Sequence, residues 1–151
     1  MSVKTVNITG SSKNNEQFVV NIDNYEIKIG ANSKNSSLNA PSPIAYILAG
    51  YAGCINAIGT LVAKELNLEL KSLNVEIKGE INTDKFLGKP TSERAGFSKI
   101  EIFLSADING NSDDIKNWIN SLESRCPVDD NLKNETPIIL NLVQKLEPQE
   151  V

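Results

Sequence analysis

Residues 43–54 read PIAYILAGYAGC and begin a long uncharged segment that predicts the centre of the fold. Ser42 before Pro43 is typical of a helix start, because serine caps the first turn and proline suits the first helical position. A helix with two apolar faces is typical of a core, so we expect a central buried helix, and its small-residue face also allows packing against a second copy. The large residues at helical spacing are Ile44, Ile47, Leu48, Tyr51, Ile55, Ile58, Leu61 and Val62, and the small ones are Ala45, Ala49, Gly50, Ala52, Gly53 and Ala57.

The same segment is also long enough to span a membrane. Ile44–Ala63 is a run of twenty residues without a charge, and a bilayer needs about 20. However, the run contains Asn56, Thr60 and three glycines, and no basic cluster flanks it. The core helix of a soluble protein has the same composition, so we expect no membrane association.

The residues before this helix predict β-structure. Apolar side chains recur at every second position on both sides of the dipeptide 23–24, Asp-Asn, which predicts a hairpin with a two-residue turn. They are Phe18, Val20 and Ile22 before the turn and Tyr25, Ile27 and Ile29 after it. Counted outward from the turn, position 22 faces 25, 20 faces 27 and 18 faces 29, so the apolar side chains share one face. Val6 and Ile8 predict an earlier strand beside this hairpin.

Further strands and loops follow from alternation and from turn-forming residues. Residues 73–81 and 100–104 alternate apolar and polar side chains and predict two strands. The segment 137–146, PIILNLVQKL, predicts a closing strand. Polar loops are expected at 31–41 and at 82–96.

A second helix is expected between these strands. Asn111 or Ser112 suits its N-cap, and its apolar stripe leads to Cys126, where Pro127 ends or restarts the helix. The element order is then β-β-β-α-β-β-α-β, with helices that do not alternate strictly with strands. This order predicts an α+β fold, and the length predicts a single domain over residues 1–151.

Composition excludes several classes of function. The chain has no histidine, so Ser-His-Asp catalysis, Cys-His catalysis and histidine-bound metals are excluded, and we expect no cofactor. A net charge of −4 and a pI near 4.9 argue against nucleic acid as a partner. The N-terminus has no apolar run, and two cysteines make no disulfide framework, so we expect a cytoplasmic protein.

Cys54 and Cys126 are the strongest candidates for chemistry, although each also lies on an apolar stripe and fits a small buried core residue. Cys126 directly precedes Pro127, so it can begin a new helical turn whose N–H groups stabilise a thiolate. Asp129 and Asp130 in that turn would oppose a thiolate, and the helix dipole alone explains their presence. Cys54 lies mid-helix and needs a cation from another segment.

Two motifs resemble the OsmC/Ohr family. Residues 43–54 are similar to its central-helix cysteine motif, and Arg125-Cys126-Pro127-Val128 is similar to its second, Cys-Pro motif. The order, the separation and the predicted elements agree with that family over essentially the whole chain. The resemblance implies an OsmC-like fold and an intertwined homodimer with active sites near the subunit interface.

The resemblance also implies a reaction. Cys54 would be the peroxidatic thiol, which reduces an organic hydroperoxide and becomes a sulfenic acid. Cys126 would be the resolving thiol, which closes a disulfide that a dithiol later reduces. A sulfenic acid needs a nearby thiol to escape further oxidation, and a disulfide needs the two Cα atoms within about 7 Å.

This chain differs from the family at two positions whose residues activate the thiol in family peroxidases. Family peroxidases have a glutamate directly after the proline, where this chain has Ile44, and an arginine in the N-terminal strands, whereas residues 1–40 contain none. Arg94 and Arg125 are the candidate replacements, since lysine lacks the bidentate fork. The alternative is a non-catalytic relative that keeps the fold and binds a small hydrophobic ligand.

Overall fold

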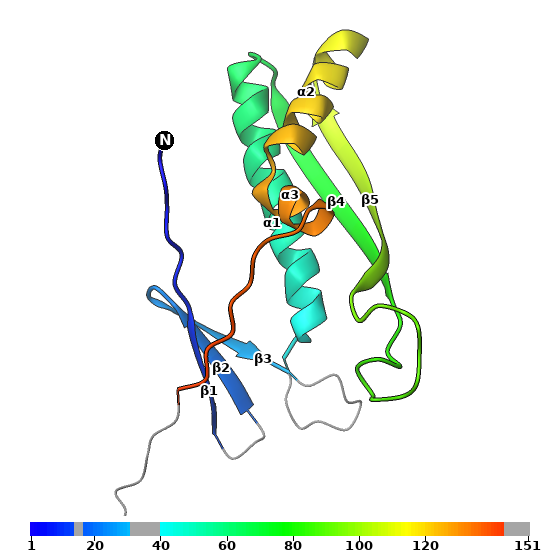
Figure 1. Cartoon of the computed structure of the whole chain (residues 1–151). Helices are drawn as coiled ribbons and strands as arrows, with labels where there is room; N and C mark the ends of the chain where they lie inside the picture. The colour runs from blue at the N-terminus through cyan, green and yellow to red at the C-terminus, as the bar shows by residue number, and fades with distance from the viewer. Residues whose placement is uncertain (14–16, 31–39, 144–151) are drawn as a thin grey trace, which may run out of the picture.

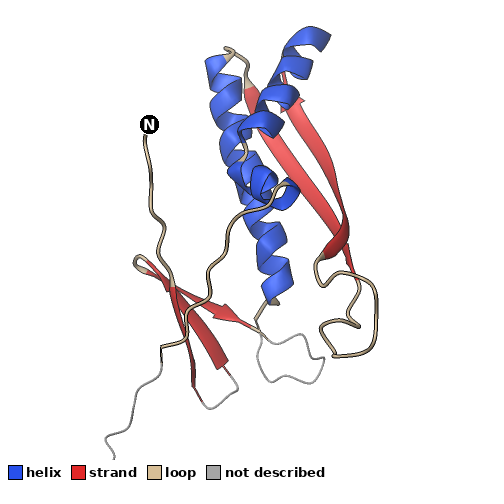
Figure 2. Ribbon diagram, viewed as in Figure 1, coloured by secondary structure: helices blue, strands red, loops and turns tan. Residues whose placement is uncertain are grey.

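The computed structural model describes residues 1–13, 17–30 and 40–143, and within them it contains two antiparallel sheets and a group of helices (Figures 1 and 2). This mixed architecture confirms the α+β prediction. The elements in chain order are β1 (Thr9–Lys13), β2 (Gln17–Ile22), β3 (Tyr25–Ile29), α1 (Pro43–Glu65), β4 (Leu70–Ile81), β5 (Phe97–Ile108), α2 (Ser112–Arg125) and α3 (Pro127–Lys133).

The N-terminal hairpin has the predicted register. Position 18 pairs with 29, 20 with 27 and 22 with 25, around a turn at Asp23, whose φ is 49°. The earlier strand begins later than predicted: β1 starts at Thr9, and Val6 and Ile8 lie outside it and are exposed. Backbone pairing with β2 decides this strand, and Gly10 suits the position because a Cβ there would lie 2.5 Å from the ring of Phe18.

Helix α1 begins as predicted. The Ser42 hydroxyl accepts a hydrogen bond from the Ala45 amide at 3.2 Å, and Pro43 occupies the first turn. The prediction that this helix is buried on nearly all sides is wrong for the single chain. Only one face is covered, whereas Gly50 and Gly53 have no atom within 4 Å of a built Cβ. The buried residues are Tyr51, Ile55, Gly59, Val62 and Ala63.

The covered face of α1 packs against the long β4–β5 hairpin and against α2. Both predicted strands form, each as part of a longer one. Gly59 allows a close approach here, because a Cβ would lie 3.2 Å from Leu122 and 3.3 Å from Leu73. The Trp118 indole donates to the Gly59 carbonyl at 2.8 Å. These contacts place the core between α1, α2 and the hairpin.

Helix α2 begins at a capping box. The Asn111 side chain accepts from the Asp113 and Asp114 amides, and Asp114 accepts from the Asn111 amide. Cys126 is both the C-cap of α2 and the N-cap of α3, so Pro127 restarts the helix as predicted.

The predicted closing strand is wrong for residues 137–143, which form no strand and are exposed. Residues 144–146 lie outside the described residues, as does most of the predicted loop at 31–41. A strand needs a neighbour for its backbone hydrogen bonds, and the described sheets, β1–β2–β3 and β4–β5, offer this segment no pairing. The exposed apolar residues are Ile138, Ile139, Leu140, Leu142 and Val143.

Helix α1 is long and apolar enough to cross a membrane by length and composition alone. This single property is weak evidence, because the core helix of a soluble protein has it too.

Candidate functional site

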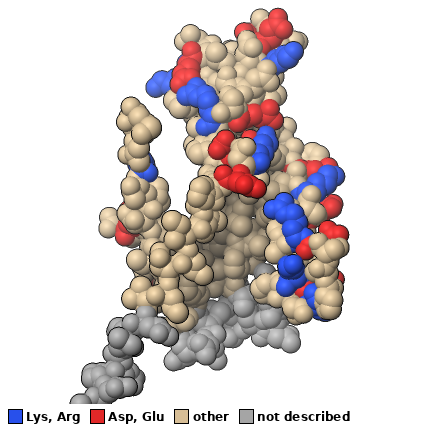
Figure 3. Space-filling model, viewed as in Figure 1, with Lys and Arg blue, Asp and Glu red and all other residues tan. Residues whose placement is uncertain are grey.

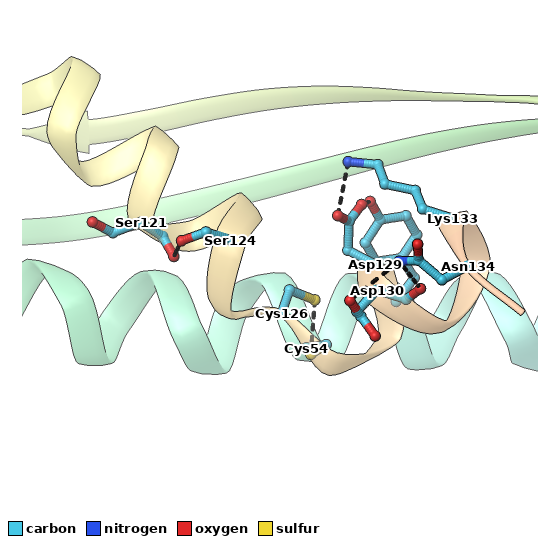
Figure 4. Close-up of polar contacts among 9 residues, drawn as sticks. Cys54, Ser121, Ser124, Cys126, Asp129, Asp130, Lys133 and Asn134 are labelled. Atoms are coloured by element: carbon cyan, nitrogen blue, oxygen red, sulfur yellow. Dashed lines mark hydrogen bonds and ion pairs between the residues drawn. The ribbon is translucent and has the colours of Figure 1, made fainter. Parts of the chain in front are cut away.

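The two cysteines, 72 residues apart in the chain, meet in the structure. The Cys126 thiol donates to the Cys54 sulfur, and the two sulfur atoms are 2.9 Å apart (Figure 4). Helix α1 supplies Cys54, and the break between α2 and α3 supplies Cys126. This sulfur–sulfur distance is only about 1 Å longer than a disulfide bond, whose length is ~2.0 Å.

The two thiols differ in their surroundings. Cys126 is 1% exposed, whereas Cys54 is half-buried, beside the uncovered face of α1. Burial is the largest cause that raises the pKa of Cys126, and the contact with Cys54 is the second. The amides of Asp129 and Val128 offset part of this rise. Cys126 is therefore protonated at neutral pH, and Cys54 is the more accessible sulfur.

A buried polar network lies one helical turn from the cysteines. The Tyr51 hydroxyl donates to the Asp129 carboxylate. The other oxygen of this carboxylate lies 2.8 Å from the Lys133 ammonium (Figure 4). Burial and the Asp129 hydrogen bond raise the pKa of Tyr51, and Asp129 raises the pKa of Lys133. The sequence explained Asp129 by the helix dipole alone, and no sequence signal pairs it with Tyr51.

Two cavities meet at this network. A mainly aliphatic cavity of about 250 Å³, which Glu123 and Asp129 also line, reaches Cys126 and lies between α1, α2 and β5. A second, more open cavity of about 700 Å³ has Tyr51, Arg94 and Lys133 among its lining residues. The aliphatic residues that line the first cavity are Ile55, Ile102, Leu104, Ile119 and Leu122.

The two candidate arginines lie in different places. Arg94 is exposed in the β4–β5 connection, on the wall of the larger cavity. The Arg125 guanidinium donates to both carboxylate oxygens of Glu65, at 2.5 and 3.1 Å. This pairing raises the pKa of Arg125 and lowers that of Glu65. The structure therefore brings Cys54 and Cys126 together and commits Arg125 to another partner.

Ile44, in the first turn of α1, is half-buried and supplies no charge. Within residues 1–13, 17–30 and 40–143, no group of three or more cysteine or acidic side chains could hold a metal ion.

A family model described as OsmC-like protein matches residues 30–141. The chain belongs to the OsmC-like family. A curated hydroperoxide reductase of Mycoplasma pneumoniae is 22% identical over 139 residues, covering 92% of this chain and 94% of that protein. A hydroperoxide reductase of Mycoplasma genitalium is 25% identical over 120 residues, covering 80% of this chain and 81% of the relative.

Solved structures share the OsmC-like fold. The OsmC-like protein from Mycoplasma pneumoniae superposes with a TM-score of 0.75 at 23% identity, covering 86% of this chain and 88% of that one. An organic hydroperoxide resistance protein from Elizabethkingia anophelis gives a TM-score of 0.60 at 21% identity, covering 85% and 88%.

Proposed function

We propose that this OsmC-like protein is a thiol-dependent peroxidase that reduces organic hydroperoxides through Cys54 and Cys126. The observation that carries the proposal is the 2.9 Å contact between their sulfur atoms. The accessible Cys54 suits the first reaction, because a peroxide must reach it. The buried Cys126, whose pKa is raised, suits the second, because it stays a thiol until an oxidised partner forms beside it.

The reaction has two steps at sulfur. Cys54 attacks the hydroperoxide, so that an S–O bond forms and the O–O bond breaks. Sulfur becomes a sulfenic acid, and the alcohol leaves with the proton. Cys126 then attacks the Cys54 sulfur, so that an S–S bond forms, the S–O bond breaks and water leaves with the thiol proton. An external dithiol reduces this disulfide, restores both thiols and becomes a disulfide itself.

Arg94 is our candidate for the cation that supports this chemistry. It lines the larger cavity together with Tyr51, which precedes Cys54 by one turn of α1. Arg125 is the weaker candidate, because its guanidinium is already paired with Glu65.

The proposal includes a homodimer in the cytoplasm. The small-residue face of α1 is uncovered in the single chain, and so are the apolar residues 138–143. In the view of Figure 3, charged side chains gather over α2, α3 and the β4–β5 connection, and the visible surface between these elements and the N-terminal segment is largely uncharged. A second copy would bury this surface and supply a pairing partner for the C-terminal segment.

The test is the fate of the two thiols after brief exposure to about one equivalent of cumene hydroperoxide. We expect the wild type to lose both thiols and about 2 Da of mass, because two hydrogens leave on disulfide formation. Cys126→Ser should accumulate a sulfenic acid at Cys54, and Cys54→Ser should keep its thiol. Survival of both wild-type thiols in excess peroxide would contradict the proposal.

The second candidate is a non-catalytic protein that binds a small hydrophobic ligand. Its support is the mainly aliphatic cavity beside Cys126, together with Ile44 in place of a charged residue. In that case both thiols would survive the peroxide, and an apolar fluorescent probe would bind the wild type. Ile119→Asp, which puts a carboxylate among the aliphatic residues of the wall in addition to Glu123 and Asp129, would weaken that binding.

A further inference from the structure

Two contacts join α1 to α3 side by side. Tyr51 meets Asp129, and Cys54 meets Cys126 (Figure 4). Tyr51 and Cys54 are three positions apart on α1, and their partners Asp129 and Cys126 are three positions apart at the start of α3. Residues three apart on a helix lie on the same face. The geometry of one contact therefore constrains the other.

The Tyr51–Asp129 contact is buried and charge-assisted. Tyr51 is 5% exposed and Asp129 is 6% exposed. Lys133 lies 2.8 Å from the second carboxylate oxygen, and the Tyr51 hydroxyl is the donor to the first. Hydrogen bonds to an ionised acceptor are about twice as strong as neutral ones.

Helix α3 has few other means of holding its position. Asp129 is its one fully buried residue, and Val128 is its partly buried hydrophobic contact with the core. The Val128 and Asp129 amides lie near the Cys126 sulfur without a capping hydrogen bond of full geometry, and Pro127 has no amide hydrogen to donate. Cys126 is held from the α2 side by its burial in the core, and on the α3 side its placement depends on what anchors the residues that follow it.

We propose that Tyr51 and Asp129 are positioning residues, whose hydrogen bond holds Cys126 against Cys54 and sets how readily the disulfide closes. The kinetic part of this inference rests on the proposed peroxidase function. The equilibrium part does not, because any thiol–disulfide exchange reagent can oxidise the pair.

The first experiment measures the thiol–disulfide equilibrium of the cysteine pair against glutathione. Oxidised glutathione and the two thiols give the protein disulfide and two reduced glutathiones, so the equilibrium constant reports the effective concentration of one thiol at the other. We expect Tyr51→Phe to lower this constant about tenfold, because it removes one hydrogen bond to a charged group. The matched control is Tyr46→Phe, which removes a hydroxyl on the same helix that donates to the Lys28 carbonyl at 2.8 Å, and it should stay within about twofold.

The second experiment separates the two steps of the reaction with cumene hydroperoxide. Tyr51→Phe should form the Cys54 sulfenic acid at the wild-type rate but close the disulfide about tenfold more slowly. A sulfenic acid trapped by dimedone would reveal the delay. A general loss of structure would change both steps and the melting temperature together. Asp129→Asn, which keeps the shape but removes the charge, is the second variant and should also slow closure.

The outcomes are distinct. Closure and glutathione equilibrium like those of the wild type in both Tyr51→Phe and Asp129→Asn would overturn the positioning role. A wild type that resists peroxide, combined with a lowered glutathione equilibrium in Tyr51→Phe, would remove the proposed function and support the positioning role.

Discussion

The packing of Trp118 on α1 offers a quantitative test of the fold. Trp118 is 2% exposed, and its indole donates to the Gly59 carbonyl at 2.8 Å. A Cβ at Gly59 would lie 3.4 Å from the indole ring, so the absence of a side chain lets the ring lie against the helix backbone. Trp118→Phe removes the donor and leaves a smaller ring in the same space.

Two separate effects lower the free energy of unfolding in Trp118→Phe. The Gly59 carbonyl keeps its intrahelical partner, so the lost hydrogen bond costs about 1 kcal/mol, at the low end of the range for a buried group. The space left by the smaller ring costs about 1–2 kcal/mol. We therefore expect the free energy of unfolding to fall by about 2–3 kcal/mol, which in a domain of this size lowers the melting temperature by about 4–12 °C.

Urea denaturation followed by far-ultraviolet circular dichroism measures this loss, at one fixed protein concentration because the proposed dimer would contribute to stability. Phe86→Leu is the control, since Phe86 is 71% exposed, and it should change the free energy by less than about 0.5 kcal/mol. A loss below about 1 kcal/mol in Trp118→Phe would refute the packing described here.

Three further predictions concern the site and the surface. Because burial raises the pKa of Cys126 above its ordinary value of 9.0, the unfolded chain loses this proton first. The contribution of Cys126 to the free energy of unfolding is therefore fully present below pH 9 and decreases as the pH rises above that value. In urea titrations at several pH values, Cys126→Ser should make this decrease smaller. Arg94→Ala should slow peroxide oxidation of Cys54 about tenfold in stopped-flow measurements, whereas Arg125→Ala should change it less than twofold. Equal slowing by both would contradict the choice of Arg94. Gly53→Glu should turn the proposed dimer into a monomer in sedimentation experiments, and an unchanged mass would exclude this face as the interface.

The local elements were predictable from the sequence, because each depends on residues close together in the chain. Alternation around the 23–24 turn predicted the hairpin register, and Ser42-Pro43 predicted the start of α1. Asn111 predicted the start of α2, where the capping box forms. Capping, turn geometry and side-chain periodicity act over a few residues, so a single sequence displays them.

The same reasoning failed where an element needs a partner. Residues 137–143 are rich in apolar side chains but have no adjacent strand among the described residues, and Val6 and Ile8, although spaced as in a strand, lie outside β1, which begins at Thr9. Alternation reports which side chains could share a face, but hydrogen bonding to a neighbour decides whether a strand forms. The uncovered face of α1 shows the same limit, because apolar composition does not say which chain covers it.

Some features of the candidate site were likewise predictable from the sequence, and others were not. The sequence alone predicted Cys54 and Cys126 as the candidate residues for chemistry, and their motifs indicated the family. Only the tertiary structure placed the sulfurs 2.9 Å apart, paired Arg125 with Glu65 and joined Tyr51 to Asp129. Each of these contacts joins residues at least 60 positions apart in the chain, and the packing of α1 against α2 and α3 creates them. No local pattern encodes such contacts, because they arise when separate helices bury their faces against each other.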